Sequence, residues 1–528
     1  KLLPRLHADD VSTDPELRNT SVNHRSSQGV IMTDQDTIVH APAGTIQGKV
    51  KNDTLLFAGI PYAQAPLEGR RFRAPEPLAP FTETFQALKF SAAAPQIPSG
   101  GMTDSAPVRW SEDCLYLNIS APTAVTQPKD PGGRAVMVWI HGGGYTSGQG
   151  AIPWYNGTRF ARNKDIVVVS INYRLGALGF ADLTHLGEEF ATSNINGTLD
   201  QIAALTWVKQ NISAFGGDPE RITIAGESAG GFSVATLMAC PEAAGLFHQA
   251  IPQSGACHHT LSQNAARTAT DYFLQELGHD TAMTLEAVSV EDILAAQNAT
   301  LGHFARGAGK INALGTFVSP FYPVHGNATL PKPPLEALAS GASADVAVMT
   351  GSNADETTLW SSGDEDLDKL ERTVAGYQAE TALAVYRGTR PNADTRDLLV
   401  ALTTDHMFRI PAIRMAEARQ SAAPTFMYEF TWQSRAFDGA LGATHSLEIP
   451  FAFDNLDQAG VSLFLGPGPT PQALADTMHQ AWSDFIKTGN PGWPRYDLVT
   501  RATMIFDDTS ELAQDPKAEE RKAWDGLR

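Results

Sequence analysis

The sequence predicts a doubly wound α/β fold, in which helices flank a mostly parallel sheet. The first observation is a series of short, continuously apolar segments, which are typical of strands buried on both faces of a sheet. They lie at residues 135–140, 166–171, 221–225, 346–351 and 425–430. The second observation is that segments with apolar residues at helical spacing accompany these strands, at residues 198–211 and 472–488. Alternating strands and helices of this kind predict parallel strands that are joined by helical crossovers.

A single large domain is expected from the positions of these segments. The chain has 528 residues, 42% of them hydrophobic and 18% charged, which is ordinary for a globular protein with a sizeable core. Residues 1–36 are polar and are expected to form a loosely attached tail, and residues 37–528 form the predicted domain. Within it, residues from about 258 to 340 are helix-prone and loop-rich. This insertion is expected to form a helical cap over the carboxyl edge of the sheet, where such folds bind ligands.

The charge and the cysteine content exclude several classes of partner. The formal net charge of -19 repels nucleic acid and anionic lipid head groups at long range. No window approaches 18 consecutive apolar residues, so stable insertion into a membrane is not expected. The three cysteines, Cys114, Cys240 and Cys257, are too few for a disulfide scaffold and are expected to be free thiols. Because no CxxC pair is present, no metal site is predicted.

The strongest chemical motif is G-E-S-A-G at residues 226–230, between an apolar strand and a helix-prone segment at 229–239. A serine at such a corner lies in a strained turn that needs small neighbours, and Gly226 and Gly230 provide them. The turn places the Ser228 hydroxyl above the sheet at a helix N-terminus, where negative charge is stabilised. A chance match in a chain with 45 glycines is the weaker interpretation, because the strand and the helix flank the motif as the chemistry requires. Ser228 is therefore the predicted nucleophile of an α/β-hydrolase fold.

A second glycine-rich segment, H-G-G-G at residues 141–144, follows the strand at 135–140. Consecutive glycines let the backbone approach a ligand closely and direct several amides at one point. Loops of this composition stabilise the oxyanion of a tetrahedral intermediate in lipases and esterases. A flexible turn is the alternative, and a phosphate-binding loop is weaker still because no G-K-[ST] follows. His141 is expected to pack beneath the loop rather than to take part in catalysis.

A nucleophilic serine needs a histidine base and a carboxylate that orients the base. Along the chain of an α/β hydrolase the order is serine, acid, histidine. Asp355 and Glu356 both follow the predicted strand at 346–351, so both are candidates for the acid. His445 is favoured as the base because it lies in a loop of small residues after the strand at 425–430. The rival histidines are His258, His259, His303, His325, His406 and His479.

With these motifs the chain resembles the type-B carboxylesterases, a family that includes para-nitrobenzyl esterases, cholinesterases and some fungal lipases. The resemblance covers residues 41–496 and rests on ordered segments along the chain. They are F-A-G-I-P-Y-A at 57–63, S-E-D-C-L-Y-L-N at 111–118, H-G-G-G at 141–144, N-Y-R at 172–174, F-G-G-D-P at 215–219, G-E-S-A-G at 226–230 and G-N-P-G-W-P at 489–494. The resemblance implies an α/β-hydrolase fold with helical cap insertions, and a serine carboxylesterase that needs no cofactor.

The resemblance also implies roles for particular residues. Glu356 rather than Asp355 is the implied acid, and His445 is the implied base. The other implied residues surround the nucleophile: oxyanion donors at the amides of Gly143, Gly144 and Ala229, and supporting polar groups at Glu227 and Ser254. The loop of residues 142–144 resembles those of esterases that accept tertiary alcohols, because no side chain projects from it.

One departure from the family concerns Cys114. Many relatives pair the cysteine of the S-E-D-C segment with one in an upstream C-P-Q segment, where this chain has A-P-Q at 94–96. Cys114 therefore lacks that partner, which weakens the case for a secreted protein. A bacterial enzyme of the cytoplasm is expected, with a location in the cell envelope or secretion as the alternatives.

Other functions of the same fold are the alternatives to ester hydrolysis. A carbamate or amide hydrolase uses the same acyl chemistry, and a lipase would need a long apolar lid, which does not stand out. A non-catalytic, cholinesterase-like binding protein would lack the triad, whose residues Ser228, Glu356 and His445 are all present. The expected substrate is therefore a small carboxylic ester. Because an ordinary histidine has a pKa of about 6.5, activity is expected to fall below neutral pH.

Overall fold

The computed structural model describes residues 24–25, 31–32, 34–97, 109–123, 132–279, 282–305, 319–361, 363 and 365–527. Most of the predicted tail at 1–36 lies outside these ranges. Its described part contains a short antiparallel pair, β1 (His24–Arg25) and β2 (Ile31–Met32). Among the described residues, no helix combines the length and the apolar character needed to cross a bilayer.

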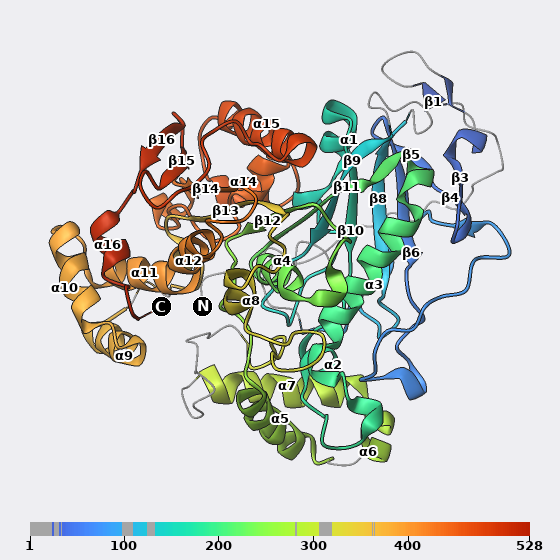
Figure 1. The fold of residues 1–528 in the computed structure, drawn as a ribbon, viewed down its shortest axis with the longest axis horizontal. Helices are drawn as coiled ribbons and strands as arrows, with labels where there is room; N and C mark the ends of the chain where they lie inside the picture. Colours follow the sequence, from blue (N-terminus) through green and yellow to red (C-terminus); the bar gives the residue numbers. More distant parts are fainter. Residues whose placement is uncertain are drawn as a thin grey trace.

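An 11-stranded sheet forms the centre of the molecule, in the order β16-β15-β14-β13-β12-β11-β9-β10-β8-β6-β5 (Figure 1). Its strands are β5 (Lys49–Lys51), β6 (Thr54–Pro61), β8 (Tyr116–Pro122), β9 (Arg134–Ile140), β10 (Val167–Ile171), β11 (Gly217–Glu227), β12 (Gln249–Gln253), β13 (Ala347–Asn353), β14 (Thr425–Phe430), β15 (Ala502–Phe506) and β16 (Glu511–Gln514). From β15 to β10 in this order, neighbouring strands are parallel. Antiparallel strands extend the sheet at both edges. The predicted mostly parallel sheet is confirmed.

Each of the apolar segments predicted to be a strand is one, namely β9, β10, β11, β13 and β14. The physical reason is that every residue of β9, β10 and β14 is buried, so these strands have no face that must be polar. Strand β12 was not predicted, because its sequence Q-A-I-P-Q has few apolar residues and contains Pro252. It nevertheless lies between β11 and β13 in the centre of the sheet.

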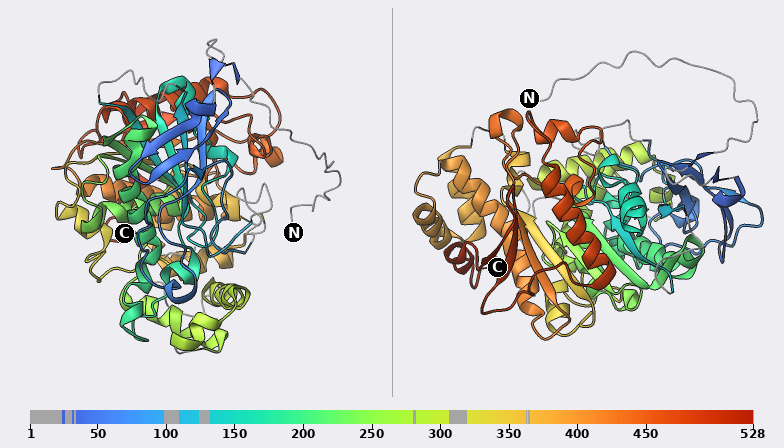
Figure 2. Two further views of the ribbon diagram at one scale, coloured as in Figure 1. Left: turned by 90° about the vertical axis from the view of Figure 1, so that its right-hand side faces the viewer. Right: turned by 90° about the horizontal axis from the view of Figure 1, so that it is seen from above.

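Helices cover both faces of the sheet (Figures 1 and 2). On one face pack α3 (Asn196–Asn211), α4 (Ala229–Ala239) and α12 (Ile410–Ala418), and on the other pack α1 (Thr158–Lys164) and α15 (Gln472–Thr488). Neighbouring side chains of a strand point to opposite faces, so β9 contributes Val136 and Val138 to one core and Met137 and Trp139 to the other. The two cores together hold the ends of the parallel strands at fixed positions.

The predicted cap insertion contains α5 (Gln263–Leu277), α6 (Ala282–Ala287), α7 (Val290–Ala305) and α8 (Pro334–Ala339) within its described part. In the view of Figure 1, α5, α6 and α7 gather at the lower end of the molecule. Helix α8 instead packs against α4 and α12, so it belongs to the helical layer on the sheet. That α5, α6 and α7 form a cap which shapes access to the site stays a prediction.

The remaining elements lie around this frame. They are the strands β3 (Ile38–Ala41), β4 (Gly44–Gln47) and β7 (Phe85–Gln86), which form a separate small sheet, and the helices α2 (Gly176–Phe180), α9 (Leu367–Tyr377), α10 (Glu380–Thr389), α11 (Thr395–Thr404), α13 (Ile449–Ala452), α14 (Val461–Leu465) and α16 (Ala518–Lys522). The cysteines Cys114, Cys240 and Cys257 are buried free thiols, as predicted.

Candidate active site

Ser228 lies at the sharp turn between β11 and α4, with φ 57 and ψ -124. A residue with a side chain rarely adopts this conformation, and it persists only where the surroundings fix it. Here the Ser228 amide donates a hydrogen bond to the Gln253 carbonyl oxygen at 3.0 Å, and its carbonyl accepts one from the Phe232 amide at 2.8 Å. The neighbouring strand β12 and the following helix α4 therefore hold the serine at the carboxyl end of the sheet.

Two glycines give the turn the space it needs. A Cβ atom on Gly226 would lie 2.6 Å from both the Gly230 carbonyl carbon and the Ile140 carbonyl oxygen, and one on Gly230 would clash with the same oxygen. These neighbours are backbone atoms, which cannot move aside as the end of a side chain can. Helix α4 can therefore start this close to β9 only because both positions are glycine.

The H-G-G-G loop passes directly beside the serine, since a Cβ atom on Gly142 would lie 3.1 Å from the Ser228 Cβ. Gly143 and Gly144 have φ values of 110 and 61, and Ala229 is the first residue of α4. Within the described ranges, no residue accepts a hydrogen bond from the amides of Gly143, Gly144 or Ala229. Amides that lie close to the nucleophile and lack an acceptor are what the stabilisation of an oxyanion requires.

His141 lies beneath this loop, as expected. Its ring stacks on Tyr173 with the centroids 4.6 Å apart, and its Nδ1 lies 2.8 Å from the Gly142 carbonyl oxygen. The Tyr173 hydroxyl donates a hydrogen bond to the His141 carbonyl oxygen at 2.9 Å. Burial lowers the pKa of His141 to about 4, so the ring is neutral and supports the loop.

Glu356 is fully buried at the start of the short helix η9 (Glu356–Trp360), directly after β13. Nδ1 of His445 and Oε2 of Glu356 form a hydrogen bond of 2.5 Å. The other carboxylate oxygen accepts a hydrogen bond from the Asn353 amide at 2.8 Å, and the His445 amide donates to the Glu356 carbonyl oxygen at 3.2 Å. Glu356 is thus the carboxylate that fixes the orientation of His445.

Asp355, the other candidate acid, faces a different way. Its Oδ2 accepts hydrogen bonds from the Ala443 amide at 3.0 Å and from Gln433 Nε2 at 3.1 Å. Asp355 therefore fastens the loop that precedes His445 and does not pair with the imidazole. The structure separates two candidates that the sequence order left equivalent.

The rival histidines have other surroundings. His259 stacks on Phe232, His303 on Tyr272 and His406 on Tyr377, while His325 contacts Thr260 and His479 contacts the Ala452 carbonyl oxygen. His258 is half-buried next to His259 in the chain. His445 is the histidine that the structure pairs with a predicted triad acid.

The other ring nitrogen of His445 faces a second carboxylate. Nε2 lies 3.1 Å from Oε1 of Glu227, the residue before the nucleophile. In the described structure no hydrogen bond joins Nε2 to the Ser228 hydroxyl. The structure therefore brings the predicted acid and base together, and the contact between base and nucleophile is not made. Such contacts often tighten only when substrate binds.

Glu448 is a buried residue of the site to which the sequence assigned no role. Its Oε1 accepts a hydrogen bond from Gln253 Nε2 at 3.1 Å, and its Oε2 accepts one from Asn353 Nδ2 at 2.7 Å. The signal in the sequence is a glutamate three residues after the base, but the motif alone does not show where its side chain points. Although several carboxylates surround His445, no group of His, Cys, Asp and Glu side chains in the described ranges is arranged to hold a metal ion.

Ser254, predicted as a supporting residue, directly follows β12. Its amide donates a hydrogen bond to the Gly351 carbonyl oxygen at 2.9 Å. Its hydroxyl is buried and has no hydrogen-bond partner among the described residues. A supporting role of Ser254 in the site stays a prediction.

The charges around His445 change its acidity. Burial alone would lower the pKa of His445, but the carboxylates of Glu227, Glu356 and Glu448 outweigh burial and raise the pKa to about 9. Burial also raises the pKa values of Glu227 and Glu448, because each carboxylate is removed from water. The protonated form of the base is therefore favoured by its surroundings.

We expect the acidic limb of the pH profile of kcat/KM to lie above the ordinary histidine value of about 6.5. The base must be neutral to accept a proton, so a raised pKa of His445 means that activity is lost as the pH falls through that higher value. The profile is measured with two esters of different leaving groups, so that a shared limb reports the free enzyme. A shared limb at or below 6.5 would show that the carboxylates do not act on the base in solution.

Aromatic rings form a wall next to His445. The rings of Trp360 and Phe408 both have centroids 4.9 Å from the imidazole, and Trp360 is 52% exposed. Phe408 comes from a single π-helical turn, η10 (Asp405–Arg409), and is buried. An exposed indole beside the reacting groups offers an apolar surface to a substrate.

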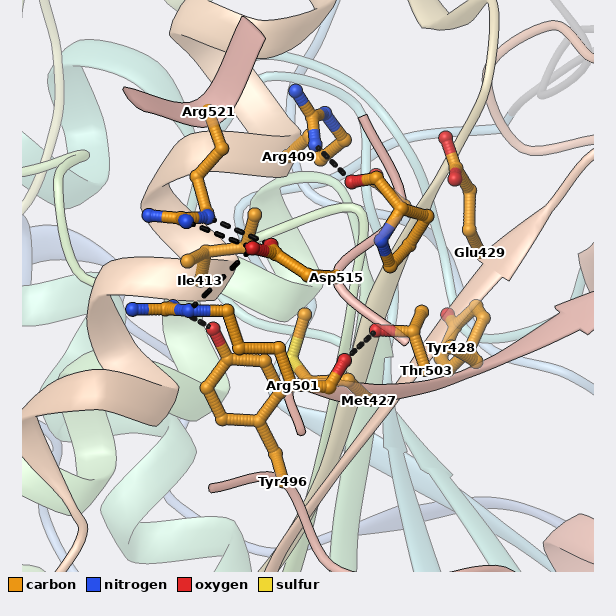
Figure 3. Close-up of a pocket in the computed structure, with 12 residues that line it drawn as sticks. Arg409, Ile413, Met427, Tyr428, Glu429, Tyr496, Arg501, Thr503, Asp515 and Arg521 are labelled. Carbon is orange, nitrogen blue, oxygen red and sulfur yellow. Dashed lines mark hydrogen bonds and ion pairs between the residues drawn. The ribbon is translucent and has the colours of Figure 1, made fainter. Parts of the chain in front are cut away.

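The pocket shown in Figure 3 lies elsewhere, where Arg501 and Arg521 reach toward Asp515. Its volume is about 20 Å³, which suits roughly one water molecule. Neither Ser228 nor His445 lines it. The arrangement of the reacting groups, rather than the presence of this pocket, therefore identifies the candidate active site.

Comparisons with known proteins show which family the chain resembles along its length. Residues 35–524 match the model of the carboxylesterase family. The chain is 37% identical to the para-nitrobenzyl esterase of Bacillus subtilis, over 92% of this chain and 98% of that protein. It is 35% identical to the phenmedipham hydrolase of Pseudarthrobacter oxydans, over 90% of this chain and 97% of that protein. Among solved structures, a carboxylesterase of Geobacillus stearothermophilus matches with a TM-score of 0.80 and 36% identity, covering 92% of this chain and 100% of that one.

Proposed function

The chain belongs to the carboxylesterase family and is a carboxylic-ester hydrolase, and we propose that Ser228 forms its acyl-enzyme with His445 as base and Glu356 as acid. Its fold is the predicted α/β-hydrolase fold. The observation that supports these roles most strongly is the 2.5 Å hydrogen bond between His445 and Glu356, at the edge of the sheet where Ser228 occupies a strained turn.

In the proposed reaction, Ser228 Oγ attacks the ester carbonyl carbon while Nε2 of neutral His445 takes the hydroxyl proton. For this step Nε2 must exchange its neighbour Glu227 for the serine hydroxyl. The amides of Gly143, Gly144 and Ala229 bind the oxyanion of the tetrahedral intermediate. The imidazolium, held by Glu356, then protonates the leaving alcohol, and water releases the acid by the same steps in reverse.

The proposed substrates are esters that carry an apolar or aromatic group. The exposed ring of Trp360 beside His445 supports this proposal, because it offers a face on which such a group can stack. A relative that covers almost the whole chain is named a para-nitrobenzyl esterase, which is in keeping with an aromatic substituent. The glycines at 142–144 add no side chain beside the nucleophile, so a branched alcohol meets less obstruction.

A matched panel of acetyl substrates tests this function: n-butyl acetate, tert-butyl acetate and N-butylacetamide. We expect the primary ester to be hydrolysed fastest, the tertiary ester measurably but more slowly, and the amide slowest. The acyl half is constant, so differences report the leaving group alone. Faster turnover of the amide than of the primary ester would favour amide hydrolysis as the function.

Turnover of the tertiary ester is measured only in the unmodified enzyme, because a substitution at Gly143 would disturb the loop itself. A Cβ atom on Gly143 would clash with the Ser147 backbone and lie 2.8 Å from its hydroxyl, and φ at Gly143 is 110. An alanine here would rebuild the loop instead of only filling the alcohol pocket. Good turnover of n-butyl acetate with no detectable turnover of tert-butyl acetate would contradict the proposed room for branched alcohols.

A further inference from the structure

Ser446, the residue after the proposed base, has an uncommon backbone and a specific contact. Its φ is 64, in the left-handed region that residues with side chains seldom adopt. In this conformation its hydroxyl donates a hydrogen bond of 2.5 Å to Oε1 of Glu227. Both side chains are buried, and the two residues lie 219 positions apart in the chain. The contact therefore ties the loop of the base to the turn of the nucleophile.

The oxygen that Ser446 holds is the same one that faces the base. Oε1 of Glu227 lies 3.1 Å from Nε2 of His445, the nitrogen that must accept the serine proton. Among the described residues, the Ser446 hydroxyl is the sole hydrogen-bond donor to this carboxylate, and the imidazole faces it at ion-pair distance. A buried carboxylate depends on such donors to remain ionised. Ser446 is thus placed to control where Glu227 lies and whether it carries a charge.

We propose that Ser446 is a positioning residue whose hydroxyl holds the Glu227 carboxylate against Nε2 of His445. The inference rests on the proposed function, since it assumes that His445 is the base. While the hydroxyl holds Glu227, the imidazolium has a carboxylate at each nitrogen, Glu356 at Nδ1 and Glu227 at Nε2. Deprotonation of the imidazolium frees Nε2 to meet Ser228. The tether therefore sets the pH at which the base becomes available.

The charged and titratable groups around Glu227 and His445 determine the direction in which the acidic limb of kcat/KM should move. The carboxylates of Glu227, Glu356 and Glu448 act on His445, and the phenols of Tyr155 and Tyr428 lie in the field of Glu227. Burial raises the pKa of Glu227, whereas the Ser446 hydrogen bond lowers it. Without the hydroxyl, Glu227 takes up a proton more readily, and a neutral Glu227 no longer raises the pKa of His445. The acidic limb of kcat/KM should then move to lower pH.

Two variants of Ser446 separate the hydroxyl from the backbone. Ser446→Ala and Ser446→Gly both remove the hydroxyl, but only glycine relieves the left-handed φ. We expect both variants to shift the acidic limb downward by the same amount, about one pH unit. Their melting temperatures should differ, with the glycine variant retaining a fold if the alanine variant does not. A shift in only one of the two would assign the effect to loop geometry and overturn the inference.

A double-mutant cycle with Glu227→Gln tests the route of the effect. In the Glu227→Gln enzyme, which has no carboxylate at this position, Ser446→Ala should produce no further shift of the limb. An equal additional shift in that background, or no shift in either Ser446 variant of the otherwise unchanged enzyme, would overturn the role of the tether while leaving the triad intact. Absence of any acidic limb in the unmodified enzyme would instead contradict His445 as the base, and the inference with it.

Discussion

Ser228→Ala is expected to lower kcat for ester hydrolysis by about 10,000-fold or more while the fold is retained. Alanine has no nucleophilic oxygen, so the acyl-enzyme cannot form. The fold should survive because the turn is held by the Ser228 backbone, through the Gln253 carbonyl and the Phe232 amide, and not by the hydroxyl. Turnover of a chromogenic acetate ester and the melting temperature measure the two effects separately.

Ser254→Ala is the matched control for this prediction. Ser254 is also buried, also has a positive φ, at 42, and also follows a central parallel strand. Its loss should affect turnover far less than the loss of Ser228, because the supporting role predicted for Ser254 involves no bond to the substrate. Losses of equal size in the two variants would show that packing at the ends of the strands, and not nucleophilic attack, is what the first variant removes.

Glu356→Gln is expected to lower kcat on the order of 1,000-fold to 10,000-fold, whereas Asp355→Asn should change it by less than about tenfold. A glutamine at 356 can present its amide nitrogen to His445 Nδ1, which favours the wrong tautomer and removes the charge that stabilises the imidazolium. An asparagine at 355 keeps an oxygen that can accept from the Ala443 amide and from Gln433. The two substitutions alter neighbouring residues by the same chemistry, so each serves as the control for the other.

The comparison requires kcat for both variants at a pH where His445 is neutral in the unmodified enzyme. Intact folding is checked by the cooperative thermal transition of each. A larger loss from Asp355→Asn than from Glu356→Gln would mean that the orientation of this loop differs from the one described, with Asp355 as the acid.

The turn that carries the proposed nucleophile can be found from the sequence because the physical demands on it are local. A strained serine needs a buried strand before it, a helix after it and small residues on either side, and all of these are visible in residues 217–239. The choice between Asp355 and Glu356 is not local, since both follow the same strand. It depends on which of the two side chains points toward His445, and His445 lies 89 positions after Glu356 in the chain.

For the same reason, the sequence does not predict the cluster of buried carboxylates around His445, which consists of Glu227, Glu356 and Glu448. Ser446 contacts Glu227, and Glu448 lies in the field of Glu227, because β11 and the loop before α13 (Ile449–Ala452) converge at the edge of the sheet. No spacing along the chain encodes that meeting. Strand β12 is a further example. Its local sequence contains Pro252 and argues against a strand, but tertiary packing overrides that local preference.

Covalent labelling identifies the nucleophilic residue. The unmodified enzyme is treated with a fluorophosphonate ester, which reacts with an activated serine nucleophile, and the modified residue is located by peptide mass spectrometry. The proposed role of Ser228 as nucleophile predicts one adduct per chain, located on Ser228, with loss of esterase activity in proportion to labelling. An adduct on another residue that abolishes activity while Ser228 stays unmodified would contradict it.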